Sequence, residues 1–194
     1  SQWNLTASAT ASYSNLDIQD SNKTGTAVNL DQTNVDSGNN TGWNFTATNA
    51  YTWIGGTSSA WATGSNWYGG VVPGADDIAI LDNNTSTYDP VISTEVSVGG
   101  LHLATNFTGT LTLNTDSVLT VGDNDLFVAG GTMNAANGRV NIDGSFTLTS
   151  SATYSASVYR TYASGNWNNQ GGSFIDNGGS VIFNGSSDQD FETG

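Results

Sequence analysis

The ionisable side chains of this 194-residue chain are few and almost all acidic. Seventeen carboxylates stand against three basic residues, Lys23, Arg139 and Arg160, and the formal net charge is −14. Asp76 and Asp77 form a carboxylate pair, and two convergent carboxylates can hydrolyse glycosidic bonds. Adjacent residues of a strand point to opposite faces, however, so this pair is not expected to converge. We therefore predict no catalytic residues and a protein that is not an enzyme.

Residues that could hold a metal ion are also scarce. There is no cysteine, and the single histidine, His102, stands between Leu101 and Leu103, so it should point outward from a strand. A lone histidine indicates neither a metal site nor a catalytic base. Four aspartates near turns would suit calcium, although hydrogen bonds to the local backbone explain them without an ion. We expect no cofactor, with calcium as the open alternative, and no other metal. The four are Asp17, Asp20, Asp31 and Asp36.

Composition limits the class of protein and its partners. Hydrophobic residues make up 36% and charged residues 10% of the chain, a balance that argues against intrinsic disorder. The abundance of Thr, Ser, Asn and Gly is typical of an extracellular all-β protein, so we expect a location outside the cell or on its surface. The acidic balance excludes nucleic acid as a partner, and no apolar run is long enough for insertion into a membrane. Because the chain begins at Ser1, we expect a mature form or a fragment.

Short alternating apolar pairs recur through residues 106–183 and predict the fold. Each pair is followed by Gly, Asn or Asp, which permit the turns that end a strand. Successive pairs lie about seven or eight residues apart, so three strands complete a turn of about twenty residues. This spacing predicts a parallel β-solenoid. The pairs are Leu111 and Leu113, Leu119 and Val121, Leu126 and Val128, Val140 and Ile142, Phe146 and Leu148, and Val181 and Phe183.

Two regions are expected, with a boundary near residue 50. Residues 1–49 should form short-strand turns, and residues 50–194 should form the main solenoid, opened by an aromatic-rich segment at 51–81. The tryptophans of that segment would either bind sugars or close the open end of the solenoid. Residues 154–167 depart from the spacing and predict either a projecting loop or a packed aromatic patch.

Surface sites follow from residue type. Aromatic side chains that line one exposed groove would contact a glycan, and the candidates are Trp61, Trp67, Tyr159, Tyr162 and Trp167. Asn-x-Ser/Thr sequons are common, and they mark possible glycosylation, although many arise by chance in such a chain. The candidates for glycosylation are Asn4, Asn22, Asn39, Asn83, Asn106 and Asn184.

Three passages carry a family resemblance: WIGG…W…SNWYGGVVPGADDIAIL at 53–81, GGSFIDNGGSVIFNGSSDQDF at 171–191, and DIQDSNKTG…VDSGNNTGWNF at 17–45. Together they resemble modules of secreted bacterial right-handed parallel β-helix proteins, which are adhesin-like surface proteins built of repeats. The resemblance implies an all-β, right-handed parallel β-helix. The order of the passages is inverted, because the sequence similar to closing turns comes first.

This inversion suggests that residues 1–45 continue the turns that end at residue 194, so the solenoid would run on between subunits. We therefore expect a structural protein that assembles head-to-tail with copies of itself into a filament or stalk. The alternatives are a polysaccharide-binding module and, with weaker support, a polysaccharide lyase or hydrolase. The expected assembly interface comprises Trp3, Leu5, Leu16, Ile18, Val181, Phe183 and Phe191.

Overall fold

A computed structural model describes residues 3–6, 17–25, 28–29, 35–44, 49–82 and 86–193. The chain divides into two compact units, Ser1–Asn49 and Ala50–Gly194. Apart from two single-turn 3-10 helices, η1 (Gly64–Asn66) and η2 (Tyr68–Gly70), the regular structure in these residues is β-strand. None of the described helices is long and apolar enough to cross a membrane.

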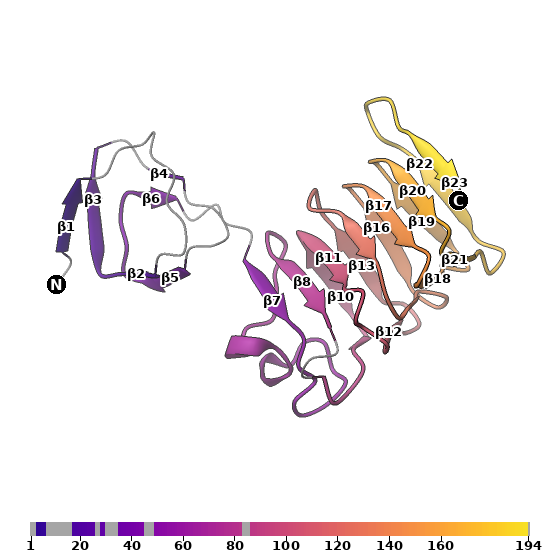
Figure 1. Ribbon diagram of the computed structural model, residues 1–194, viewed down its shortest axis with the longest axis horizontal. Helices are drawn as coiled ribbons and strands as arrows, with labels where there is room; N and C mark the ends of the chain where they lie inside the picture. Colours follow the sequence, from indigo (N-terminus) through magenta and orange to yellow (C-terminus); the bar gives the residue numbers. More distant parts are fainter. Residues whose placement is uncertain are drawn as a thin grey trace. The chain divides into compact units, whose positions relative to one another are not determined.

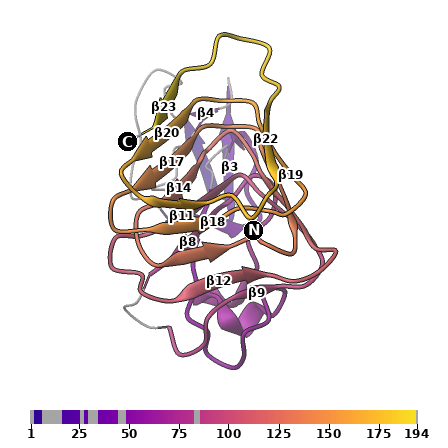
Figure 2. The same cartoon turned by 90° about the vertical axis from the view of Figure 1, so that its right-hand side faces the viewer.

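The larger unit is a parallel β-solenoid whose chain visits three sheets in a fixed order (Figures 1 and 2). The first sheet contains β7 (Ala50–Thr52), β8 (Ile78–Leu81), β11 (Gly100–Leu103), β14 (Leu126–Val128), β17 (Phe146–Thr149), β20 (Trp167–Gln170) and β23 (Phe191–Thr193). The second contains β9 (Val91–Ile92), β12 (Thr110–Leu113), β15 (Thr132–Asn134), β18 (Thr153–Ser155) and β21 (Ser173–Ile175). The third contains β10 (Glu95–Val98), β13 (Val118–Val121), β16 (Arg139–Ile142), β19 (Arg160–Ala163) and β22 (Ser180–Phe183).

The register gives the length of a turn. Leu126 pairs with Phe146, and Phe146 pairs with Trp167, so successive turns are nearly equal in length. Each turn contains one strand from each sheet. The predicted all-β parallel solenoid, with three short strands per turn of about twenty residues, is therefore confirmed.

The core is a set of ladders in which equivalent side chains of successive turns stack. In β12, β13 and β16 buried residues alternate with more exposed ones, because successive side chains of a strand point to opposite faces. Burial of these apolar side chains stabilises each turn through its neighbours, by about 1.5–3 kcal/mol for a fully buried residue. One ladder of the first sheet runs through Ala79, Leu101, Leu126, Phe146, Trp167 and Phe191.

Three tryptophans close the N-terminal end of this core. Trp53, Trp61 and Trp67 are all buried, and the rings of Trp61 and Trp67 meet edge to face with centroids 4.7 Å apart. Their indole N–H groups are anchored in part, since Trp53 Nε1 donates to the carbonyl of Tyr88 at 2.7 Å. The segment that carries them is held by the buried Asn66 side chain. The tryptophans therefore form the predicted closure of the solenoid.

Residues 154–167 do not project from the solenoid. They contain the end of β18, all of β19 and the first residue of β20, so they form a regular part of one turn. Tyr154 and Trp167 are buried and belong to the core ladders. The prediction of a projecting loop is therefore wrong, and the aromatic residues that suggested it fill the interior.

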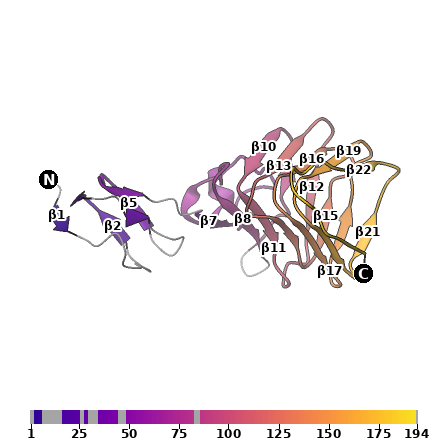
Figure 3. The ribbon, with the colours of Figure 1, turned by 90° about the horizontal axis from the view of Figure 1, so that it is seen from above.

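The smaller unit repeats the same principle with slightly shorter turns (Figure 3). Its described strand pairs are all parallel, and Trp3 pairs with Ser21 of the next turn. Ile18 and Trp43 are buried, and Trp43 Nε1 donates to Ser21 Oγ at 3.0 Å. Its strands are β1 (Trp3–Thr6), β2 (Asp17–Gln19), β3 (Ser21–Thr24), β4 (Val28–Asn29), β5 (Val35–Gly38) and β6 (Trp43–Asn44).

Candidate functional site

The last turn of the larger unit presents an apolar end. Phe191, Phe183 and Phe174 continue the core ladders of the three sheets, but they are 58%, 43% and 36% exposed. The preceding members of the same ladders, Tyr154 and Trp167 among them, are buried. The ladders thus continue to the end of the solenoid without a described turn to cover them.

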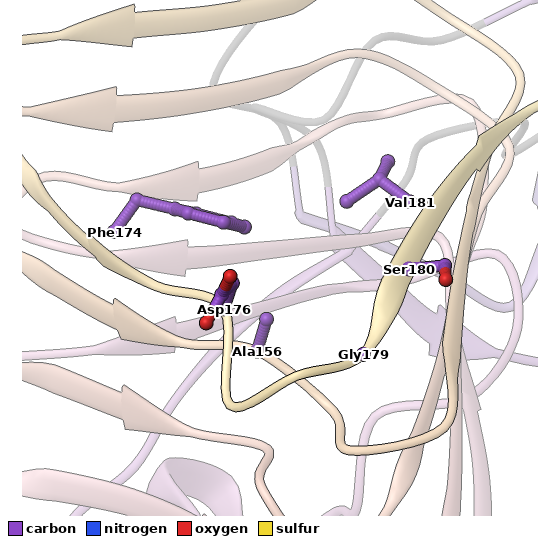
Figure 4. A pocket seen from close by; sticks show the side chains of 6 residues that line it. All are labelled: Ala156, Phe174, Asp176, Gly179, Ser180 and Val181. Atoms are coloured by element: carbon purple, nitrogen blue, oxygen red, sulfur yellow. The ribbon is translucent and has the colours of Figure 1, made fainter.

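Two hollows lie in this end. One has a volume of about 190 Å³ and is lined mainly by apolar side chains. The other, of about 150 Å³, adjoins it, and in Figure 4 Phe174 from β21 and Val181 from β22 point into it from two sides. The first hollow is lined by Trp167, Asn169, Phe174, Val181, Phe183, Phe191 and Thr193.

The backbone at this end is also open for pairing. Among the described residues, β21, β22 and β23 are the last strands of their sheets, and each pairs with a strand on one side only. Unpaired N–H and C=O groups along a strand form a template for another strand. Apolar side chains and free strand edges therefore coincide at this end, whereas tryptophans close the other end of the unit.

The structure divides the expected interface residues. Val181, Phe183 and Phe191 lie at the apolar end, and Phe183 and Phe191 are exposed there. In the smaller unit Trp3 is 48% exposed, but Ile18 is buried in its own unit, so the expectation of an interface role for Ile18 is wrong. The side chain of Leu5 and the whole of Leu16 lie outside the described residues.

The five predicted glycan-contact residues are not brought into one exposed groove. Trp61, Trp67 and Trp167 are buried, because they fill the N-terminal closure and a core ladder, so their ring faces are not available to a sugar. Tyr159 is 43% exposed and Tyr162 is half-buried. Alternation alone could not separate these cases, since an aromatic residue suits either face of a strand.

Tyr159 and Tyr162 instead share an open hollow of about 390 Å³ with Arg139 and Arg160. The guanidinium carbon of Arg139 lies 5.0 Å from the centroid of the Tyr159 ring. The arginines were not predicted as a site. The signal was their spacing in the sequence, which equals one turn of the solenoid and so places them on neighbouring strands.

Outside this hollow the ionisable groups do not converge. His102 points outward as predicted, with Nε2 at 3.2 Å from the carbonyl oxygen of Asn124. Asp77 accepts a hydrogen bond from the backbone N–H of Gly74 at 2.8 Å, which is a turn contact. Asp20 accepts from Asn39 Nδ2 at 2.6 Å. Across the part of the chain that the structure describes, no group of three or more His, Cys, Asp or Glu side chains could hold a metal ion.

Two tyrosines have perturbed ionisation. Burial raises the pKa of Tyr154 to about 12, although a hydrogen bond between its hydroxyl and Thr161 Oγ1 partly opposes the shift. The pKa of Tyr51 is raised by burial and by the nearby negative charge of Asp77. Neither tyrosine lies beside a second group that could exchange a proton with a substrate, so both shifts reflect packing.

The sequons differ in accessibility. Asn4, Asn39, Asn106 and Asn184 are exposed, and Asn22 is half-buried. The Nδ2 groups of Asn22 and Asn39 donate to Asn4 Oδ1 and Asp20 Oδ1. Asn83 lies outside the described residues.

Comparison of this chain with protein families, curated proteins and solved structures gives no match. The fold therefore rests on the geometry described above.

Proposed function

We propose that this protein is an extracellular structural protein that assembles head-to-tail into a surface filament or stalk. The observation that carries the proposal is the difference between the two ends of the larger unit. Tryptophans close one end, and at the other end three phenylalanines that continue core ladders are exposed beside unpaired strand edges.

The occupant that we assign to this end is the N-terminal region, residues 1–45, of another copy. Its described strands are parallel and short, as in the larger unit, and Trp3 is an exposed aromatic side chain there. Strand addition would satisfy the free backbone groups, and apolar side chains would cover Phe174, Phe183 and Phe191. Because the two surfaces are unlike, the contact does not close on itself and propagates into a fibre.

The test is assembly of the full chain and of a Phe183→Ser/Phe191→Ser double variant, followed by light scattering and electron microscopy. The matched control is Tyr68→Ser, which removes an exposed aromatic from the opposite end of the unit. The double variant should remain monomeric while the control assembles. A chain that lacks residues 1–45 should also fail to assemble alone. Equal assembly of all four chains, or monomers throughout, would contradict the proposal.

A polysaccharide-binding module is the second candidate function. The hollow that contains Tyr159, Tyr162 and two arginines supports it, because aromatic rings and charged donors are the usual lining of a sugar site. A polysaccharide lyase or hydrolase has no convergent carboxylates among the described residues in its favour, and only the fold recommends it.

A further inference from the structure

The two basic residues of the larger unit lie in the same hollow. The chain has three basic residues, and the third, Lys23, belongs to the smaller unit. Arg139 and Arg160 line the hollow together with Tyr159 and Tyr162. The volume of about 390 Å³ falls within the range of roughly 300–1,000 Å³ that is usual for ligand pockets. In a chain with a net charge of −14, this is a local concentration of positive charge.

The register sets the two arginines side by side. Val140 of β16 pairs with Thr161 of β19, and both are buried. Arg139 and Arg160 stand one residue earlier on these strands, so both side chains point outward from neighbouring strands about 4.8 Å apart. Like charges in this arrangement repel each other and destabilise the pair of strands. Neither guanidinium forms an ion pair with a carboxylate of the described residues. An anion between the two groups would remove the repulsion.

The hollow is held in shape by the backbone. The N–H of Tyr159 donates to Ser157 Oγ at 3.0 Å, and the buried Ser157 hydroxyl donates to the carbonyl of Gly138. The carbonyl of Tyr159 accepts from the N–H of Ser180 at 3.2 Å. The ring of Tyr159 is thereby fixed, and Arg139 lies over one of its faces. A site that is already ordered loses less entropy when a ligand binds.

We propose that this hollow binds an anionic sugar residue of a polysaccharide, through a carboxylate or sulfate group held by Arg139 and Arg160. Guanidinium groups bind such oxyanions through paired, charge-assisted hydrogen bonds. Tyr159 and Tyr162 supply rings against which a pyranose can pack. A sugar with one or two charges fits better than a nucleic acid, because the surrounding protein is strongly acidic and repels a dense polyanion. The proposal is independent of head-to-tail assembly and narrows the second candidate function.

The test is calorimetric titration of the full chain with three oligosaccharides: an oligogalacturonate, a sulfated galactose oligomer and a neutral galactose oligomer. Binding of either anionic sugar at least tenfold tighter than the neutral sugar is expected, and comparison of the two anionic sugars identifies the preferred group. Raising the salt concentration from 50 to 500 mM should weaken this binding.

Variants locate the site. Arg139→Gln and Arg160→Gln should each weaken binding of the anionic sugar at least tenfold. Thr94→Asp, on an exposed residue outside the hollow, makes the same change in net charge and should have no such effect. Arg139→Lys keeps the charge but loses the planar fork, and it provides an intermediate case if the glutamine variant is unstable in a thermal melt. Equal affinity for charged and neutral sugars, no binding of any sugar, or arginine variants that bind normally would each overturn the proposal. Assembly is measured separately, so its failure would not affect this result.

Discussion

Tyr154 and Phe174 occupy equivalent positions on the neighbouring strands β18 and β21, with ring centroids 5.8 Å apart, yet Tyr154 is fully buried and Phe174 is 36% exposed. One step along the ladder changes a core residue into a surface residue. The same change occurs between Trp167 and Phe191. The position of a turn within the solenoid, and not the type of side chain, therefore decides how much a residue contributes to stability.

Phe146→Ala and Phe191→Ala compare the same substitution at two positions of one ladder. Phe146 is buried between turns, so its loss should cost about 3–5 kcal/mol through lost burial and a residual cavity. Phe191 is 58% exposed, and its loss should cost less than about 1 kcal/mol in the monomer. Urea unfolding at low protein concentration measures both. Similar losses for the two variants would show that the end of the ladder is covered.

Tyr154 should make stability depend on pH in the alkaline range. Its pKa is about 12 in the folded protein and about 10 when unfolded, so the folded state keeps the proton longer. The stabilisation is complete below pH 10 and is lost as pH rises towards 12, by about 2–3 kcal/mol. Tyr154→Phe should reduce this loss, as measured by unfolding at pH 8 and at pH 11.5. Tyr159→Phe, at an exposed position, is the control, and an unchanged slope in Tyr154→Phe would contradict the assignment.

Asn66 should be essential to the tryptophan closure. Its buried side chain accepts from the backbone N–H groups of Thr57 and Ser58, both at 3.0 Å, and donates to the carbonyl of Ala60 at 2.8 Å. Asn66→Ala would leave buried polar groups without partners and should cost about 2–4 kcal/mol. Tryptophan fluorescence should shift to longer wavelength as water reaches the indoles. Asn137→Ala, at an exposed position, should leave stability and fluorescence unchanged; equal behaviour of the two variants would contradict this role.

Gly165 should not tolerate a side chain. A Cβ at this position would lie 2.4 Å from the carbonyl oxygen of Gly144 in the preceding turn, so the turns would have to separate. Gly165→Ala should therefore destabilise by about 1–3 kcal/mol. At Gly74 the nearest atom to an added Cβ is Asp77 Oδ2 at 3.5 Å, and Gly74→Ala should be neutral or slightly stabilising. Thermal melts that fall equally in both variants would indicate a general intolerance of turns.

The spacing of apolar pairs predicted the fold because each strand is short and each turn has nearly the same length. Leu113 and Ile142 fall in the core for that reason alone. Residues 154–167 were interpreted less well, because a tyrosine or tryptophan suits the interior as well as the surface. The arginine hollow depends on register, since Arg139 and Arg160 become neighbours only when the chain between them makes one complete turn. Side-chain alternation gives the face of a strand but not its neighbour.

The contrast between the closed and open ends gives unfolding a direction. Each turn holds its neighbours in place, and the three tryptophans cover the first turn, while β23 has a paired strand on one side only within the described chain. Fraying should therefore begin at β23 and proceed backwards turn by turn, so that amide hydrogens of β22 exchange before those of β13. Pulling on the C-terminus would then unwind the solenoid progressively, one turn after another. A copy docked on that end would act as a lock against unwinding, and the mechanical strength of a filament would be set at its joints.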